Sequence, residues 1–357
     1  MPKHVILPYE GVLPSFSTPV LHAGEGSAVV GRVTMGRGAW LGALSAVRAD
    51  GHVVKVGDDF HLGPRSTLHI AHDVFPCLVG DCVTVGENAC VHACTVGNNV
   101  VLEDGCVVLD GAVVADNVAF EPGSIVFPGA KIQSGFLYAG MPAKPVRQLE
   151  PNEIEERRRA VTARADLHHR IAPRDRPAVG SEMHPSFFIA ATATVKGRIV
   201  AAQESSVFFS NDLDAGNSTI IIGEKTNIQD NTIIQCSSDG IQIGRESTIG
   251  HNVLLNDCAI GDRSLIGIGS TVARGTVIGN DVLLVAGART EEGQVLEDGY
   301  LYTGTPARKR IPLDVAKREM IAFTIRTYCH YSQVFKAAQG EPIDRLASVR
   351  FKTTAVR

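Results

Sequence analysis

The sequence predicts an all-β architecture of two tandem left-handed parallel β-helices, each followed by an α-helix. Three observations predict it: hydrophobic residues recur at every sixth position, the second half of the chain repeats the first, and aromatic side chains are scarce. The 357 residues include 36 glycines, and only 6% of them are aromatic. A chain of this length is expected to hold two domains. A narrow prism filled by small aliphatic side chains leaves little interior room for rings, which explains the low aromatic content.

The six-residue period appears in both halves. Its members are Val96, Leu102, Val108, Val114, Phe120 and Val126 in the first half, and Ile260, Ile266, Val272, Ile278 and Leu284 in the second. A period of six fits neither the 3.6 residues of an α-helical turn nor the two-residue alternation of a strand. It fits a coil with three short flat faces that turn at small or polar residues, such as Gly97-Asn98 and Gly261-Asp262.

The two halves are copies of one unit. Residues 79–94 align without gaps to residues 243–258, and the closing segment 137–144 reappears as 301–308. The predicted organisation is a first domain over residues 1–170, a linker rich in proline and arginine over 171–184, and a second domain over 185–357.

A helical segment is predicted after each β-helix. The first spans residues 153–168 and the second spans Asp314 to about Phe335. In the second, Ile321, Ile325 and Tyr328 recur at helical spacing, so we expect this stripe to pack against a β-helix or a neighbouring chain. The charged run inside the first segment is expected to face solvent.

The composition excludes several classes of function. A formal net charge of −4 gives no electrostatic reason to expect nucleic acid, and 44% hydrophobic residues exclude general disorder. The N-terminus lacks a secretion-signal pattern and no apolar run reaches membrane-spanning length, so we expect a cytoplasmic protein without a membrane partner. The eight cysteines form no CxxC pair, which favours reduced and mostly buried thiols over a disulfide framework.

Short polar motifs accompany the hexapeptide pattern. The first half has Arg48-Ala49-Asp50, His69 and His92, and the second half has Asn227-Ile228-Gln229-Asp230 and Gly250-His251. Together these motifs resemble the pattern of γ-class carbonic anhydrases, which runs Arg-Gly-Asp, Asn-Ile-Gln-Asp, a first histidine, and later Gly-His-x4-His. The resemblance covers nearly the whole of each half. It implies threefold packing of β-helices, with two histidines of one subunit and one of its neighbour binding zinc.

Each half keeps only part of this pattern. In the first half, Glu87 replaces the middle histidine and Gly63-Pro64 replaces the Gln-Asp pair. In the second half, the positions of the arginine, the aspartate, the first histidine and the last histidine hold Asp214, Gly216, Gln235 and Asn256. In the family, the first and third histidines lie on one face of the β-helix and the middle one on the opposite face. Each half has therefore kept the face that the other lost.

The resemblance implies a composite metal site. If a first domain packs beside a second, His69 and His92 meet His251, and a three-histidine site forms with one position open for water. Zn²⁺ is the implied metal, and Fe²⁺ or Co²⁺ suits the same ligands.

Four further residues belong to the implied site. Arg48 and Asp230 would face each other across the junction, Asp50 completes the Arg-Gly-Asp element, and Gln229 would orient water or product through its amide. A metal with three neutral ligands lowers the pKa of bound water, so that hydroxide can attack carbon dioxide or a related carbonyl. The implied function is a metal-dependent hydratase or hydrolase, a lyase in the case of carbon dioxide, with a small-molecule substrate.

Other interpretations stay open at this level. Rings of identical domains would instead bind a metal through His69, His92 and Glu87 of a neighbour, in a homo-oligomer of simple threefold symmetry. That geometry does not explain why the second half keeps Gln229 and His251 of the motif, so the composite site is favoured. A coenzyme A-dependent acyltransferase and a non-catalytic assembly protein share the same fold.

Several candidates also have plainer explanations. His251 follows a glycine at a corner where polar turn residues are common, and Gln229 and Asp230 would satisfy backbone groups at a turn. Tyr138 and Tyr302 lie in the closing segments and are expected to pack there.

Overall fold

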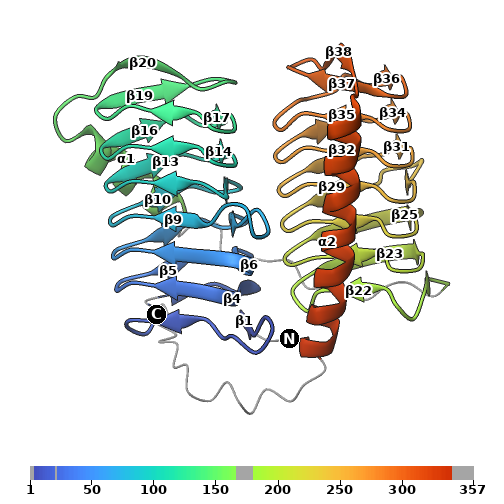
Figure 1. Cartoon of the computed structure of the whole chain (residues 1–357), viewed down its shortest axis with the longest axis horizontal. Coiled ribbons are helices and arrows are strands. Elements are labelled where there is room, and N and C mark those ends of the chain that lie inside the picture. Colours follow the sequence, from blue (N-terminus) through green and yellow to red (C-terminus); the bar gives the residue numbers. More distant parts are fainter. Residues whose placement is uncertain (1–3, 21, 166–179, 340–357) are drawn as a thin grey trace. The chain divides into compact units, whose positions relative to one another are not determined.

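The computed structural model describes residues 4–20, 22–165 and 180–339. The chain divides into two compact units, residues 1–171 with 337–357 and residues 172–336 (Figure 1). We call them unit 1 and unit 2. The predicted linker, 171–184, lies mostly outside the described residues, and the exact domain boundaries stay a prediction.

Unit 1 is built from two sheets. The first contains β1 (His4–Leu7), β2 (Ser15–Phe16), β4 (Ser27–Met35), β6 (Ala46–Val56), β8 (Thr67–His69), β9 (Cys77–Val79), β11 (Cys90–His92), β12 (Thr95–Val96), β14 (Val107–Val108), β15 (Val113–Val114), β17 (Ile125–Val126) and β18 (Lys131–Ile132). The second contains β3 (His22–Ala23), β5 (Trp40–Leu41), β7 (His61–Leu62), β10 (Thr84–Val85), β13 (Val100–Leu102), β16 (Val118–Phe120), β19 (Phe136–Ala139) and β20 (Lys144–Gln148).

Unit 2 repeats this plan. Its first sheet contains β21 (Glu182–Met183), β23 (Thr194–Ala201), β25 (Asp212–Ile222), β27 (Ile233–Gln235), β28 (Ile241–Ile243), β30 (Leu254–Asn256), β31 (Ala259–Ile260), β33 (Thr271–Val272), β34 (Val277–Ile278) and β36 (Val295–Leu296). Its second sheet contains β22 (Phe188–Ile189), β24 (Ser206–Val207), β26 (Asn227–Ile228), β29 (Thr248–Ile249), β32 (Leu265–Ile266), β35 (Leu283–Leu284), β37 (Tyr300–Thr303) and β38 (Arg308–Pro312).

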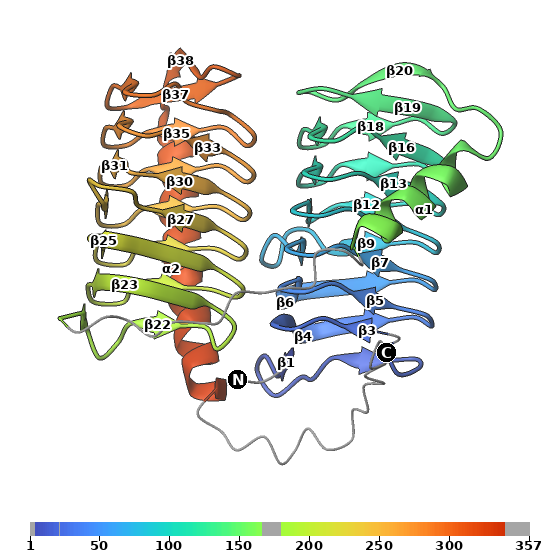
Figure 2. The same ribbon diagram turned by 180° about the vertical axis from the view of Figure 1, so that it is seen from behind.

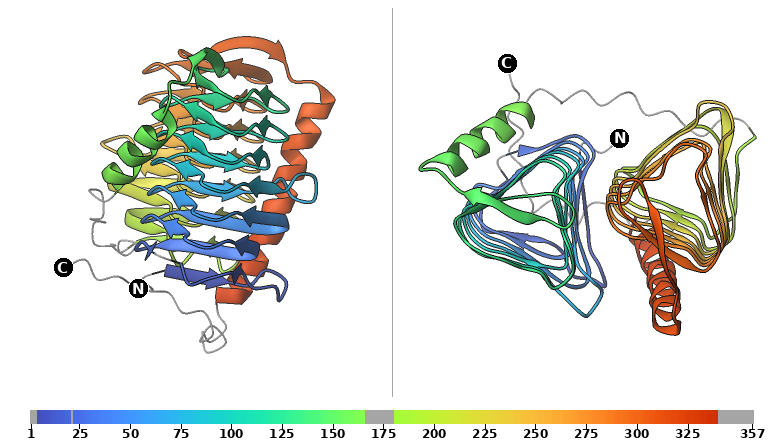
Figure 3. Two further views of the ribbon diagram at one scale, coloured as in Figure 1. Left: turned by 90° about the vertical axis from the view of Figure 1, so that its left-hand side faces the viewer. Right: turned by 90° about the horizontal axis from the view of Figure 1, so that it is seen from above.

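Each unit is a parallel β-helix, whose stacked coils are seen from behind in Figure 2 and whose triangular cross-section is seen in the right-hand view of Figure 3. The long strand β6 runs round one corner, since its start pairs with β8 and its end pairs with β9. Val96 pairs with Val114 on the next coil, so one coil of three faces takes 18 residues. Only the closing pairs, β19 with β20 and β37 with β38, are antiparallel among the assigned strand pairs. The predicted fold class is confirmed.

The residues of the six-residue period form the core of each unit. All of those named above are at most 3% exposed. Consecutive members lie on three different faces: Val96 on β12, Leu102 on β13 and Val108 on β14. The period of six therefore places one aliphatic side chain in the interior from each face of every coil.

A ladder of polar side chains at one corner fixes the stacking of the coils. The amide of Asp81 donates to Asn98 Oδ1 at 2.8 Å, and the amide of Asn98 donates to Asp116 Oδ1 at 2.7 Å. A Cβ added to Gly80 would lie 2.6 Å from Asn98 Oδ1, and one added to Gly97 would lie 2.3 Å from Asp116 Oδ1. Glycine before Asp81 and before Asn98 is thus a steric requirement of the acceptor on the next coil.

The first helix, α1 (Glu153–Ala165), buries Val161 and Ala165 and is also held by charged side chains. Its Arg157 pairs with Glu103 of the β-helix at 2.5 Å, and the two side chains are only 20% and 12% exposed. Arg158 donates to Asn99 Oδ1 at 3.1 Å. The expectation that this charged run faces solvent is therefore right for Glu155, Glu156 and Arg159, and wrong for Arg157 and Arg158, which contact the corner of the β-helix.

The second helix, α2 (Val315–Gln339), runs along unit 2 (Figure 1). It begins one residue after the predicted start, and Asp314 caps it by accepting the amide of Lys317 at 2.8 Å. Ile321 and Ile325 are buried and pack with partly buried leucines of the β-helix, such as Leu265. The predicted apolar stripe is thus confirmed as a packing surface. Neither helix in the described part of the chain is long and apolar enough to span a membrane.

Candidate functional site

Two histidines lie side by side on one face of unit 1. His69 ends β8 and His92 ends β11, and the two residues are paired in register on adjacent coils. Their side chains therefore point to the same side of the sheet. His69 is 2% exposed and the side chain of His92 is 12% exposed.

Each of these rings has one nitrogen against a carboxylate. His69 Nε2 lies 2.7 Å from Asp50 Oδ1, and His92 Nδ1 lies 2.5 Å from Asp110 Oδ1. The two remaining nitrogens, His69 Nδ1 and His92 Nε2, are 3.3 Å apart. A carboxylate on one nitrogen fixes the tautomer and leaves the lone pair on the other, as in metal-binding histidines. The donor set of this face therefore fits a divalent metal.

Asp50 connects His69 to a buried arginine. Arg48 Nη1 lies 2.5 Å from Asp50 Oδ2, and both side chains are fully buried. Separating the two charges would leave an unpaired charge in the protein interior and destabilise the fold. The ion pair therefore holds the Asp50 carboxylate in place. Arg48 and Asp50 thus position His69 within unit 1.

The candidate residues of unit 2 form a second cluster. Asp230 Oδ1 accepts the amide of Phe209 at 2.9 Å, and its Oδ2 lies 3.2 Å from His251 Nδ1. Asp230 and His251 are both fully buried. Gln229 is 5% exposed, and its Nε2 lies 3.4 Å from Asn227 Oδ1. The plain explanation for Asp230, that it satisfies a backbone amide, is correct for one oxygen, while the other faces the histidine.

Two residues at these clusters were not found by sequence reasoning. Asp110 lies 18 residues after His92, one coil along the β-helix, and this spacing is the signal that would have found it. Tyr328 of α2 places its hydroxyl oxygen 3.3 Å from His251 Nε2, whereas the sequence assigned it to packing alone.

Several curated relatives each match less than half of this chain. Protein YrdA of Escherichia coli strain K12 is 36% identical over 155 residues, which is 42% of this chain and 84% of YrdA. A carbonic anhydrase of Geobacillus kaustophilus is 31% identical over 160 residues, 44% of this chain and 86% of that protein. The chain belongs to the γ-carbonic anhydrase-like hexapeptide-repeat family.

Other comparisons give partial matches. Gamma carbonic anhydrase 1, mitochondrial, of Arabidopsis thaliana is 29% identical over 172 residues, and the chain spans 62% of its length. A solved structure of a putative acetyltransferase from Bacillus cereus is 28% identical with a TM-score of 0.44, and it covers 45% of this chain and 95% of its own. No protein-family model matches the chain. Matches of less than half the chain fit a duplication of the family's β-helix.

The strand register gives the positions of the family motif in both units. In unit 2, Asp214 pairs with Gln235, and Gln235 pairs with Asn256, so these three residues form one column along the sheet. This column matches the place of His69 and His92 in unit 1. Unit 2 therefore carries no histidine on the face that bears two of them in unit 1.

Glu87 occupies the corner of unit 1 that corresponds to His251. It follows β10 as His251 follows β29, and its amide donates to Asp104 Oδ1 at 2.9 Å. The alternative metal site that includes Glu87 stays a prediction.

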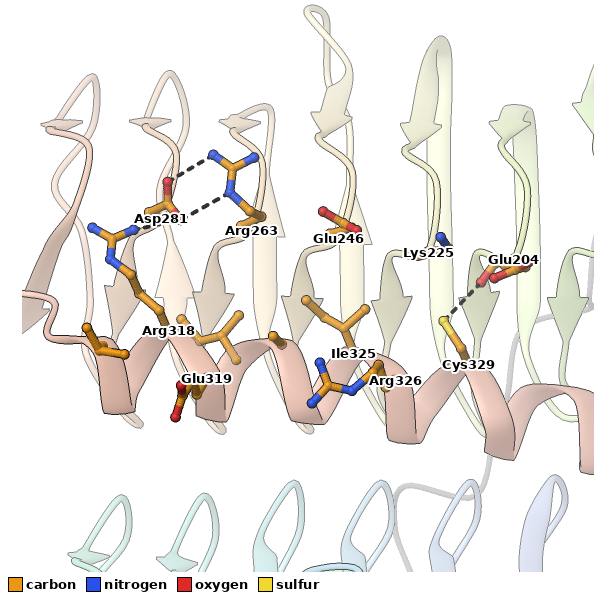
Figure 4. Close-up of a pocket in the computed structure, with 13 residues that line it drawn as sticks. Glu204, Lys225, Glu246, Arg263, Asp281, Arg318, Glu319, Ile325, Arg326 and Cys329 are labelled. Carbon is orange, nitrogen blue, oxygen red and sulfur yellow. Dashed lines mark hydrogen bonds and ion pairs between the residues drawn. The ribbon is translucent and has the colours of Figure 1, made fainter.

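Unit 2 also has a groove of about 710 Å³ between α2 and one corner of the β-helix (Figure 4). Its β-helix wall carries five residues of alternating charge, each with φ between 51° and 56°: Glu204, Lys225, Glu246, Arg263 and Asp281. Asp281 pairs with Arg263 at 2.9 Å and with Arg318 of α2 at 2.8 Å. The groove contains none of the candidate site residues.

Six of the eight cysteines are buried inside the two units. Burial raises the pKa of Cys106, Cys236 and Cys258 to about 12. These three thiols are therefore protonated at neutral pH.

Proposed function

We propose that the chain is a metal-dependent hydratase or hydrolase of the γ-carbonic anhydrase type, acting on carbon dioxide or a related small carbonyl substrate. The observation that carries this proposal is the pair of carboxylate-oriented imidazoles whose other nitrogens, His69 Nδ1 and His92 Nε2, are 3.3 Å apart. Zn²⁺ is the proposed metal, and Fe²⁺ or Co²⁺ would suit the same donors. When bound, such a metal supplies Lewis acidity that brings the pKa of a water ligand toward neutrality.

The third ligand in this proposal is His251, given by a unit 2 that belongs to this chain or to another copy. Two facts support it. Asp230 lies against His251 Nδ1 as Asp50 and Asp110 lie against the other two histidines, so all three candidate ligands have a carboxylate partner. Unit 1 also has Glu87 rather than a histidine at the corner that corresponds to His251. Unit 2 has no histidine in the column of Asp214, Gln235 and Asn256, which corresponds to His69 and His92. A homo-oligomer with threefold packing of β-helices would bring the two faces together.

The remaining candidates hold or orient groups at this site. Asp50 and Asp110 leave the lone pairs on His69 Nδ1 and His92 Nε2, and Arg48 neutralises Asp50 in a buried setting. Asp230 gives His251 the corresponding tautomer. Gln229 would orient a small polar substrate or product through its amide.

The experiment that tests this function is carbon dioxide hydration by the full-length chain loaded with Zn²⁺. We expect hydration above the uncatalysed rate, and its loss in His92→Ala. His52→Ala is a matched control, because His52 lies in the same unit outside the candidate site and its Nδ1 accepts the neighbouring amide of Val53 at 2.8 Å. No hydration by the loaded wild type, together with acyl transfer from an acyl-coenzyme A, would favour the acyltransferase. Neither activity from an intact oligomer would favour an assembly role.

A further inference from the structure

The hydroxyl of Tyr328 contacts the nitrogen of His251 that the proposed function gives to a metal. Tyr328 Oη lies 3.3 Å from His251 Nε2, while His251 Nδ1 lies 3.2 Å from Asp230 Oδ2. A neutral imidazole has one N–H group and one in-plane lone pair, and an ionised carboxylate can only accept. The carboxylate beside Nδ1 favours the tautomer with its N–H there, and in that tautomer the phenol donates its proton to the lone pair at Nε2.

We propose that Tyr328 competes with the metal for the lone pair of His251 Nε2, and so couples the position of α2 to metal affinity. One lone pair cannot accept a hydrogen bond and bind a cation at the same time. Metal binding at His251 then requires the hydroxyl to move to another acceptor. This inference rests on the proposed function, since only a metal-binding His251 needs that lone pair.

The ring of Tyr328 is fixed by an aromatic cluster, so its hydroxyl does not move alone. It is 5% exposed, and its ring packs edge-on against Phe208 and Tyr331, with centroid distances of 5.0 and 5.5 Å. Further along the same helix, Phe335 packs edge-on against Phe208 and Phe209, with centroid distances of 6.3 and 5.5 Å. Moving the hydroxyl away from His251 therefore moves this part of α2.

The groove beside α2 gives the helix room for such a movement. Ile325 and Cys329, which flank Tyr328 in the sequence, line the groove (Figure 4). The opposite wall bears Lys225 and Glu246. This side of the helix has open space beside it, but Ile325 itself packs against the β-helix, so a displacement of Tyr328 has to keep or replace the Ile325 contact.

Cobalt titration of the full-length, metal-stripped protein tests the competition. Co²⁺ binds the same donors as Zn²⁺, and its visible absorption reports histidine ligation. In Tyr328→Phe, His251 Nε2 loses a hydrogen bond that the metal would otherwise have to displace, so we expect the Kd for Co²⁺ to fall about 2- to 10-fold. Tyr331→Phe is the matched control, as a buried tyrosine of the same helix, and its Kd should stay within about twofold of the wild type. Equal or weaker Co²⁺ binding by Tyr328→Phe would overturn the proposal.

A second readout separates coupling from simple packing. Hydrogen exchange in α2 around residues 325–332 should change when Co²⁺ is added to the wild type, and should change much less in Tyr328→Phe. The same metal-induced change in both proteins would count against coupling.

His251→Ala identifies which claim fails. If it binds Co²⁺ like the wild type, the proposed metal site is wrong. If it loses Co²⁺ while Tyr328→Phe equals the wild type, only the competition is wrong.

Discussion

His69 Nδ1 lies 3.3 Å from His92 Nε2, and each ring turns its other nitrogen to a carboxylate on the same β-helix. This relationship arises from the register of adjacent coils, because β8 and β11 pair residue for residue. The two carboxylates come from different places. Asp50 lies on the long strand β6, and Asp110 lies one coil beyond His92. Four consecutive coils, those of β6, β8, β11 and β14, thus build one face that can bind a metal.

Replacing Asp110 with asparagine should weaken metal binding without unfolding the chain. The carboxylate at 2.5 Å from His92 Nδ1 fixes the tautomer and raises the basicity of the ring. Loss of such a partner typically costs about 10- to 100-fold in metal affinity. Competitive Zn²⁺ titration measures the change. Asp116→Asn is the control, since its side chain is a corner acceptor in a ladder where Asn98 already serves the same purpose. Equal affinities for both variants would contradict the role given to Asp110.

Gly80→Ala should destabilise unit 1 through a clash between coils. The new Cβ would lie 2.6 Å from Asn98 Oδ1 and 2.8 Å from the backbone carbon of Gly97. Overpacking of this kind costs about 1 to 3 kcal/mol, and the backbone contact favours the upper end. Gly123→Ala tests backbone strain alone, since Gly123 has φ +71° and nothing within 4 Å of the new Cβ. Denaturant midpoints should fall further for Gly80→Ala, and the reverse order would refute the steric explanation.

Protonation of Glu153 at acid pH should weaken the attachment of α1. Hydrogen bonds from Arg147 are the main cause that lowers the pKa of Glu153 from 4.5 to about 2. A carboxyl with a lower pKa in the folded chain stabilises the fold above its unfolded pKa, and this stabilisation is lost as pH falls toward the folded value. The Tm advantage of the wild type over Glu153→Gln should therefore be full at neutral pH and disappear between about pH 4.5 and 2.

The control for this prediction is Glu156→Gln, because Glu156 lies on the same helix and is exposed. Its difference in Tm from the wild type should be small and nearly independent of pH. A Glu153→Gln difference that persists unchanged at pH 2.5 would show that the charge of Glu153 does not contribute.

Alkylation should distinguish buried from accessible thiols. Burial raises the pKa of Cys106 and Cys258 to about 12, so little of either thiol is ionised near pH 8. Cys82 is only partly buried. Iodoacetamide treatment followed by peptide mass spectrometry should therefore label Cys82 before the other two. Rapid labelling of Cys106 in the folded protein would contradict its burial.

The repeat made most of the fold predictable. A period of six with glycine and polar corners has one regular solution, so Val96 and Val114 could be placed on the same face without coordinates. The motif residues His69 and His92 could be paired for the same reason. Their distances, and the carboxylates that orient them, depend on the coil register, which the motif alone does not state.

Residues that act through tertiary packing escaped prediction. Tyr328 looked like one more position of an apolar helical stripe, since nothing in the sequence tells which side chain of unit 2 meets the tip of its ring. Arg157 and Arg158 looked like an exposed charged face, because their acceptors, among them Glu103 and Asn99, are more than fifty residues away in the chain. Both cases depend on where a helix docks after its β-helix has formed.

The central claim is that His69, His92 and His251 bind one metal. The most direct test is the metal content of the purified full-length chain, measured by mass spectrometry for the wild type, His251→Ala and Glu87→Ala. The composite site predicts bound metal in the wild type and in Glu87→Ala, and its loss in His251→Ala. Metal that survives in His251→Ala but is lost in Glu87→Ala would contradict the composite site in favour of rings of identical domains, and a metal-free wild type would contradict both.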